Sequence, residues 1–399
     1  MTLLNSVDAI PKLTERVQVT ENLVWDRWLW APVIALALVG VLIVATSSME
    51  FSQKTYDNPF SVLTRHGVYL LLAMTAGLVM SLIPIKLWQQ ANWVFLLIGL
   101  GLLTMVLVPG IGHEVNGSKR WIRFGPAGIQ PSELMKLFLV MYVSGYLVRR
   151  AAEVRSQWSG FLKPILVLAV VIVLLLMEPD FGAVVVTMGA VLGMMFLGGV
   201  RASQFFLLVI VCSGAVAAMA FAQPYRVQRL MAFLDPWSAD NVFAGGYQLT
   251  QALIAIGRGE WFGVGLGNSM LKLFYLPEAH TDFVFAILAE EFGLIGVLIV
   301  LTLFSLMIGR MFLIGQMAQA KGLGFGAYAC YGFAMIFAIQ TLINIGVNTG
   351  LLPTKGLTLP LISYGGTSLI ICFAMLGFVQ GVYHQALHAP MPKDEEGDT

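Results

Sequence analysis

Ten long apolar segments follow one another along this chain and constrain its fold more than any other feature. The hydrocarbon core of a bilayer is about 30 Å thick, so a helix needs roughly 20 mainly apolar residues to cross it. Segments that meet or approach this length lie at 29–48, 67–85, 88–109, 132–148, 164–177, 183–200, 204–223, 283–309, 325–351 and 367–384. The sequence therefore predicts an all-α polytopic membrane protein with ten transmembrane helices.

The composition supports this fold class and narrows the function. Hydrophobic residues make up 58% of the chain and charged residues 11%, against about 45–50% and about 25% in soluble domains. The net charge is +1 and no basic tract occurs, so we expect no nucleic-acid partner. The cysteines Cys212, Cys330 and Cys372 each lie within an apolar run, which predicts neither a disulfide framework nor a metal cluster.

The polar ends and the short loops indicate how the chain is oriented. Residues 1–27 lack the features of a cleavable signal and predict a cytoplasmic tail. The membrane domain is expected over 28–385, with a second cytoplasmic tail at 386–399. The 149–163 loop is rich in Lys and Arg and falls on the same side as both tails, which fits the positive-inside rule.

Two loops on the opposite side, 110–131 and 224–282, carry cations against that rule. The second is far longer than a usual connection, and such loops are functional or disordered. Its aromatic residues and the apolar run 249–256 argue for order. Arg side chains, aromatic residues and Gln251 suit a phosphate or sugar headgroup. The alternative is that a long loop simply escapes the rule.

Asp282 stands where the long outer loop enters the eighth predicted span. One interpretation makes Thr281 or Asp282 the N-cap of that helix, which would lower the pKa of the carboxyl group. Burial at the membrane boundary would instead raise this pKa. Catalysis and capping are equally compatible with the position.

Two further pairs of charged residues fall within predicted spans. Glu290 and Glu291 follow Asp282 by about 12–13 Å along an ideal helix. Carboxylates at that depth are either protonated or paired with a cation from another span, as a polar clamp or as catalytic groups. Glu133 and Lys136, spaced i, i+3 in the fourth span, predict an ion pair that is structural or belongs to the site.

These residues leave three classes of function: a transporter, a channel, or an enzyme acting on a membrane-anchored anionic substrate. No Gly-x4-Gly-Lys-Ser/Thr loop is present, which excludes ATP hydrolysis by that route. No spacing of His, Cys and Asp predicts a zinc site.

Four strings of residues resemble the signatures of the SEDS (shape, elongation, division, sporulation) family. They are Gln130-Pro-Ser-Glu133, Gly246-Tyr-Gln-Leu249, Leu276-Pro-Glu-Ala-His-Thr-Asp-Phe283 and Leu352-Pro-Thr-Lys-Gly-Leu-Thr-Leu-Pro-Leu-Ile-Ser-Tyr-Gly-Gly366. They occur in the family's order, and the resemblance extends from about residue 28 to 385. The segment Thr354-Lys355-Gly356 resembles the division branch more than the elongation branch.

The resemblance implies a ten-helix SEDS fold and polymerisation of lipid II into β-1,4 glycan strands, with undecaprenyl diphosphate released. It places the family's essential acid on Asp282, which we interpret as the general base. It carries a functional Glu and Lys onto Glu133 and Lys136. It also implies the bacterial inner membrane at the division septum, a periplasmic active site, a class B penicillin-binding protein partner and other divisome proteins.

Stabilising the leaving diphosphate requires fixed cations, and a divalent ion, Mg²⁺ or Mn²⁺, could share this role. The candidate cations are Arg65, Lys119, Arg120, Arg226, Arg229, Arg258, Lys272 and Lys355. Two other functions stay open: a lipid II flippase, which also needs a cationic cavity and intramembrane carboxylates, and a scaffold for division proteins.

Overall fold

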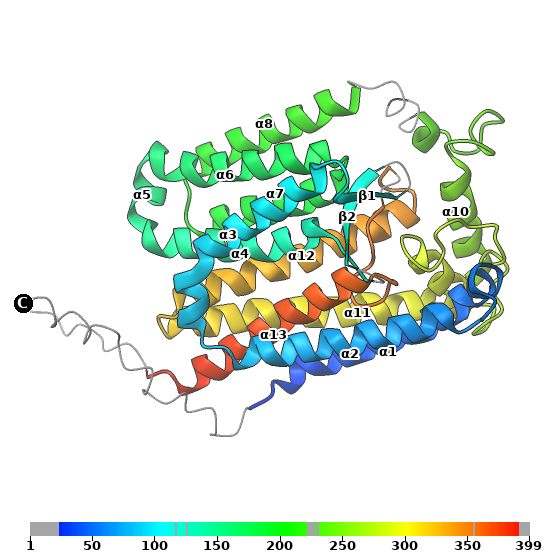
Figure 1. Ribbon diagram of the computed structural model, residues 1–399, viewed down its shortest axis with the longest axis horizontal. Helices are drawn as coiled ribbons and strands as arrows, with labels where there is room; N and C mark the ends of the chain where they lie inside the picture. Colours follow the sequence, from blue (N-terminus) through cyan, green and yellow to red (C-terminus); the bar gives the residue numbers. More distant parts are fainter. Residues whose placement is uncertain are drawn as a thin grey trace, which may run out of the picture.

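The computed structural model describes residues 24–390 apart from 116–117, 125–126, 222–226, 228–230 and 354–355. In this part of the chain, each of the ten predicted spans falls on a helix. These helices run side by side as a bundle (Figure 1). They are α1 (Arg27–Tyr56), α2 (Ser61–Leu82), α3 (Ile85–Leu107), α4 (Pro131–Arg149), α6 (Trp158–Met177), α7 (Phe181–Leu197), α8 (Ala202–Phe221), α11 (Val284–Ala320), α12 (Gly324–Asn348) and α13 (Gly366–His388).

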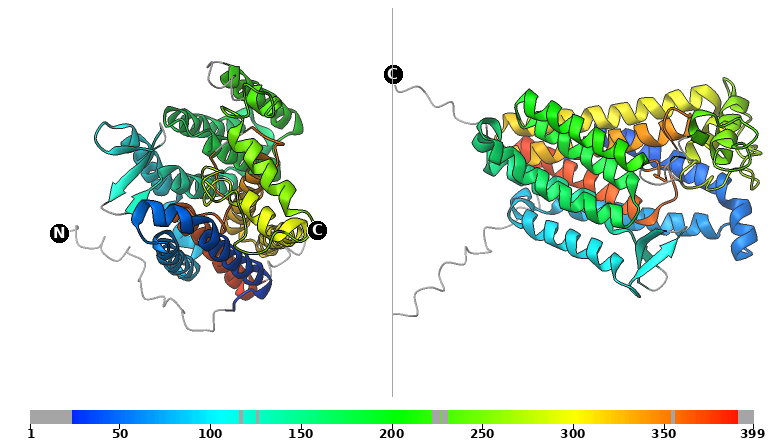
Figure 2. Two further views of the ribbon diagram at one scale, coloured as in Figure 1. Left: turned by 90° about the vertical axis from the view of Figure 1, so that its right-hand side faces the viewer. Right: turned by 90° about the horizontal axis from the view of Figure 1, so that it is seen from above.

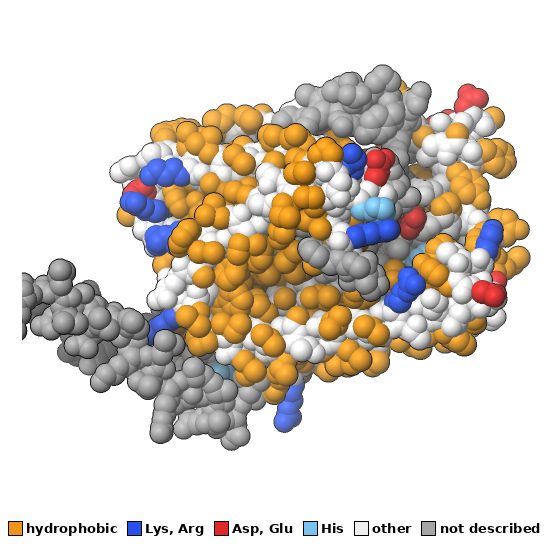
Figure 3. Space-filling model, viewed as in Figure 1, with side chains coloured by type: hydrophobic (Ala, Val, Ile, Leu, Met, Phe, Trp, Pro, Cys, Tyr) orange, Lys and Arg blue, Asp and Glu red, His pale blue; other side chains and the backbone are white. Residues whose placement is uncertain are grey.

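Length and hydropathy confirm a polytopic membrane protein. Seven helices among the described residues are long and apolar enough to cross a bilayer, and two shorter apolar helices lie at Phe181–Leu197 and Ala202–Val211. Apolar side chains cover much of the face of the bundle that Figure 3 shows. Such a surface requires lipid as its solvent, because water would not tolerate so large an apolar area.

The helices differ in how much of their surface the rest of the protein covers. The most apolar window of α13 is 78% buried and that of α12 is 67% buried, whereas the window of α2 is only 22% buried. A helix that is covered on most sides belongs to the core of a bundle. Helices α12 and α13 are therefore the central elements, and the loop that joins them emerges from the middle of the bundle.

The outer loops contain regular structure that the hydrophobic pattern did not predict. The 110–131 loop forms a three-stranded antiparallel sheet of β1 (Gly112–Val115), β2 (Ser118–Phe124) and β3 (Ala127–Ile129), in that order. The long outer loop contains α10 (Tyr247–Gly259), as expected for an ordered segment. Both lie at the end of the bundle opposite the short helix α5 (Ala151–Ser156) (Figures 1 and 2).

Helix α11 is broken, so the eighth predicted span at 283–309 is not one continuous helix. Gly293 has φ 65° and ψ −166°, a conformation open essentially to glycine alone. The outer loop fills this break: the Leu294 amide donates to the Glu260 carbonyl at 2.9 Å, and the Val264 amide donates to the Glu290 carbonyl at 2.9 Å. A β-carbon on Gly293 would lie 2.4 Å from the Gly263 nitrogen. The break therefore depends on close backbone contact with the loop.

Candidate active site

Asp282 lies between the end of α12 and the loop that joins α12 to α13. Its backbone carbonyl accepts hydrogen bonds from Asn344 Nδ2 at 2.9 Å and from Asn348 Nδ2 at 3.1 Å. Asn344 Nδ2 also donates to the Leu357 carbonyl at 2.6 Å. The two asparagines thus bring Asp282 and the 356–357 backbone together. The side-chain carboxylate lies directly against Gly356.

The second half of the same loop fixes the residues just before Asp282. Ser363 Oγ donates to the Thr281 carbonyl at 2.6 Å, and the Tyr364 amide donates to the His280 carbonyl at 3.0 Å. The three residues 280–282 are therefore held by hydrogen bonds from two long-range segments. Such support limits the positions that the Asp282 carboxylate can adopt.

The structure decides whether Thr281 or Asp282 caps α11. The N-cap of α11 is Phe283, and it has no side-chain cap. The capping alternative for Thr281 and Asp282 is therefore wrong. Burial raises the pKa of Asp282 to about 7, with further increases from the negative charges of Glu278 and Asp180 and an opposing decrease from Arg120. A base acts best when its pKa is close to the working pH.

Arg120, on β2, is the cation whose charge acts on Asp282. Its Nε donates to the Glu178 carbonyl at 3.2 Å, its Nη2 donates to the Pro179 carbonyl, and its Nη1 lies 4.0 Å from Asp180 Oδ1. The connection between α6 and α7 therefore orients the guanidinium group. Because the side chain stays partly exposed, it can still face an anionic ligand.

The carboxyl groups in that connection have different environments. Asp180 caps α7 by accepting from the Ala183 amide at 3.2 Å, and it also accepts from Ser132 Oγ at 2.9 Å. Glu178 is fully buried, and neither of its carboxyl oxygens has a hydrogen-bond partner. Burial and the charge of Asp180 raise the pKa of Glu178 to about 8, against an opposing effect of Arg120.

The predicted pair Glu133–Lys136 is present and buried. Lys136 Nζ lies 2.8 Å from Glu133 Oε1 and 2.8 Å from Gln340 Oε1, and the lysine is 1% exposed. Gln340 Nε2 donates in turn to the Thr358 carbonyl at 3.0 Å. The ion pair is thus connected through α12 to the loop that carries Gly356.

The family model described as cell cycle protein, which covers FtsW, RodA and SpoVE, matches residues 26–388. The chain belongs to this family. The match includes every element described above, from α1 to α13.

Individual members of the FtsW/RodA/SpoVE family agree with this assignment. A protein of Hahella chejuensis named probable peptidoglycan glycosyltransferase FtsW is 51% identical over 376 residues, which cover 94% of each chain. RodA from Thermus thermophilus has the same fold, with a TM-score of 0.66 and 27% identity over 90% of this chain and 96% of that chain. A chain from a study titled "Structural coordination of polymerization and crosslinking by a peptidoglycan synthase complex" has a TM-score of 0.75 and 28% identity, covering 92% and 99%.

The other residues that were predicted to bind the substrate lie in different parts of the structure. Arg258 and Lys272 do not point to Asp282: Arg258 Nη1 lies 2.9 Å from Glu290 Oε1, and Lys272 Nζ lies 3.0 Å from Glu291 Oε1. The predicted pairing of the two glutamates with cations is confirmed, but both cations belong to the outer loop and not to another span. The carboxylates form a clamp that holds this loop against the break in α11.

Arg65, Lys119 and Gln251 make no described hydrogen bond to Asp282 or Arg120. Arg65 lies on α2 beside Tyr56. Lys119 is exposed and precedes Arg120 on the same strand, where adjacent side chains point to opposite faces. Gln251 is half-buried on α10. The remaining predicted cations, Arg226, Arg229 and Lys355, lie outside the described residues.

The residues that position Asp282 were missed by the sequence reading. Asn344 and Asn348 are polar residues one helical turn apart within an apolar span. Such residues usually face protein, and this spacing was the signal that would have marked them. Glu178 and Asp180 lie between the fifth and sixth predicted spans and were not among the predicted site residues.

A divalent ion, Mg²⁺ or Mn²⁺, was predicted to help stabilise the leaving diphosphate. In the described part of the chain, no group of three or more His, Cys, Asp and Glu side chains is arranged to hold a metal ion. The predicted Mg²⁺ or Mn²⁺ therefore stays a prediction.

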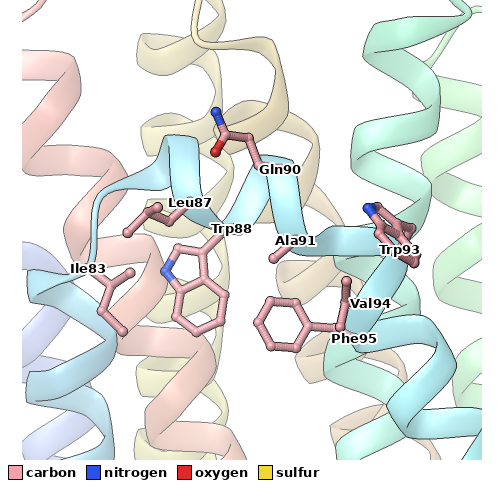
Figure 4. A pocket seen from close by; sticks show the side chains of 8 residues that line it. All are labelled: Ile83, Leu87, Trp88, Gln90, Ala91, Trp93, Val94 and Phe95. Atoms are coloured by element: carbon pink, nitrogen blue, oxygen red, sulfur yellow. The ribbon is translucent and has the colours of Figure 1, made fainter. Parts of the chain in front are cut away.

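An apolar hollow of about 430 Å³ lies at the start of α3, between Ile83, Trp88 and Phe95 (Figure 4). Its lining has no charged side chain, which separates it from the polar site.

Proposed function

We propose that this membrane protein is a peptidoglycan glycosyltransferase that polymerises lipid II into β-1,4 glycan strands and releases undecaprenyl diphosphate. Membership of the FtsW/RodA/SpoVE family and the relative's name support the reaction class. The observation that carries the assignment to residues is the position of Asp282. The residue is half-buried, its backbone is held by α12 and by the loop after it, and its carboxyl group has a pKa of about 7.

The proposed chemistry gives each residue one task. Asp282 accepts the proton from the 4-hydroxyl of an acceptor N-acetylglucosamine. That oxygen forms a bond to C1 of the donor N-acetylmuramic acid, and the bond from C1 to the diphosphate oxygen breaks. Arg120 stabilises the charge that collects on the leaving diphosphate, because fixed cations act strongly where water is excluded. A positioned base contributes about 10²–10⁴-fold to such a step.

Polymerisation by the purified chain with lipid II tests the assignment. Asp282→Asn keeps the size of the side chain but cannot accept the proton, so glycan polymer should be lost while thermal stability is retained. Asp240→Asn is the matched control, because Asp240 is an exposed aspartate in the same outer loop. Polymer formation by Asp282→Asn at the rate of the Asp240→Asn protein would refute the role of Asp282.

A lipid II flippase is the competing function. Movement of lipid II across a liposome bilayer without any polymer would support it. Growth of cells that carry only Asp282→Ala would instead support a scaffold. The named relative, a glycosyltransferase, favours the enzyme.

We further propose the location and the partners of the enzyme. The apolar helices and the family place the chain in the bacterial inner membrane as a multi-pass protein. We infer that the active site faces the periplasm at the division septum. A structural neighbour belongs to a complex that coordinates polymerization and crosslinking. This supports a crosslinking partner, which we propose is a class B penicillin-binding protein of the divisome.

The predicted divalent ion is tested by measuring polymer formation after addition of EDTA, and again after addition of Mg²⁺ or Mn²⁺.

A further inference from the structure

A row of aromatic rings leads from the vicinity of Asp282 to the exposed end of α1. The His280 ring centroid lies 4.8 Å from that of Phe51 and 5.9 Å from that of Tyr364. Phe51 lies 6.4 Å from Tyr56. These separations are within the range of about 4.5–7 Å at which aromatic side chains interact. Four rings from three separate segments therefore form one row.

Hydrogen bonds fix this row relative to the site. The Tyr364 amide donates to the carbonyl of His280 at 3.0 Å, and His280 is two residues before Asp282. The same two segments are joined again by Ser363 and Thr281. The rings of His280 and Tyr364 consequently keep a constant relation to the carboxylate.

The outer half of the row is accessible and has a polar edge. Tyr56 is 40% exposed and Phe51 is 36% exposed. The guanidinium carbon of Arg65 lies 4.4 Å from the centroid of the Tyr56 ring, and its Nη1 donates to the Tyr56 hydroxyl at 3.3 Å. Burial raises the pKa of the Tyr364 hydroxyl, and Arg65 opposes this increase. The row thus combines open ring surface with a cation and two phenol hydroxyls.

Exposed aromatic residues near a helix end also occur as membrane-interface belts. A belt anchors a protein through separate side chains and does not require them to touch. Here the rings contact one another, the outermost ring lies against Arg65, and the buried His280 in the row is two residues before Asp282. This arrangement fits a ligand that has apolar faces and polar edges in alternation. A pyranose sugar has this character, since its C–H bonds form faces and its hydroxyls form the rim.

We propose that Tyr56, Phe51 and Tyr364, packed around the buried His280 ring, form a sugar-binding strip that holds the glycan chain on the α1 side of Asp282, with Arg65 as a hydrogen-bond donor to its oxygens. This inference rests on the proposed function. A strip that holds the strand between successive additions keeps the enzyme on one strand. Its loss shortens the polymer, whereas loss of the base stops the reaction.

The length of the strands made from lipid II by the full-length protein tests the strip. Tyr56→Ala removes an exposed ring and should shorten the mean strand by roughly two- to tenfold, the range expected from one aromatic contact. Tyr56→Phe keeps the ring and should restore the length. Tyr275→Ala is the matched control, because Tyr275 is another exposed tyrosine of the outer face. Strands of wild-type length from Tyr56→Ala would overturn the proposal.

A binding measurement separates this inference from the catalytic assignment. Saturation-transfer NMR with a soluble β-1,4 tetramer of N-acetylglucosamine, on the full chain in nanodiscs, should show transfer from aromatic protons to the sugar. Tyr56→Ala should lose this transfer, and Asp282→Asn should keep it. The wild-type protein could show transfer that depends on Tyr56 and yet make no polymer. This result would support the strip and refute the proposed function. Equal transfer in wild type and Tyr56→Ala would refute the strip.

Discussion

Oδ2 of Asp282 lies 2.9 Å from the position that a β-carbon would take on Gly356. Carbon and oxygen cannot approach this closely without displacement, so Gly356→Ala must move the carboxylate. We expect polymerisation to fall on the order of 10²-fold, the effect of a misplacement of about 1 Å at a catalytic group. Gly67→Ala is the control, because no atom lies within 4 Å of its added β-carbon. Unchanged kcat for Gly356→Ala would show that the carboxylate is not held in place.

The pKa of Asp282 predicts how activity depends on pH. A base acts in its ionised form, so kcat/KM should rise with pH and reach half its maximum near the pKa of about 7. The charge of Glu278 raises this pKa, so Glu278→Gln should move the midpoint to lower pH. Glu260→Gln, in an exposed part of the same loop, should leave the midpoint unchanged. A midpoint that rises in Glu278→Gln would contradict the electrostatic assignment.

The buried pair Glu133–Lys136 predicts a strong non-additivity in stability. Lys136→Met leaves the Glu133 carboxylate buried without its cation, which costs about 3–5 kcal/mol. The double variant Glu133→Gln/Lys136→Met removes both charges and should be less destabilised than Lys136→Met alone. A double-mutant cycle on unfolding in detergent measures the coupling. Additive effects would indicate that the two groups do not interact.

Two arginines that looked equivalent in the sequence should behave differently. Arg258 is bound to Glu290, so Arg258→Ala should lower the melting temperature, and Glu290→Gln should add little to this effect. Arg120 faces the site, so Arg120→Ala should lower kcat/KM for lipid II much more than it lowers the melting temperature. An Arg258→Ala protein with a raised KM and an unchanged melting temperature would instead indicate that Arg258 binds the substrate.

Local signals were sufficient for part of the site. The ion pair of Glu133 and Lys136 follows from their i, i+3 spacing, since one helical face places the two side chains together. Asp282 was found because it stands at the mouth of a span, at a position that resembles the family's acid. A clamp at Glu290 and Glu291 was among the predictions, but the source of its cations was wrong, because a continuous helix was assumed where Gly293 breaks it and the outer loop enters.

The apolar pattern by itself determined that the chain crosses a membrane many times, because a buried backbone must form its hydrogen bonds within helices. The tertiary structure alone decided which cation acts on Asp282 and which aromatic rings meet. Arg120 and Asp282 are far apart in the chain: the connection between α6 and α7 holds Arg120, whereas α12 and its following loop hold Asp282. Helical spacing reports only contacts within one element, so contacts between elements require the packed bundle.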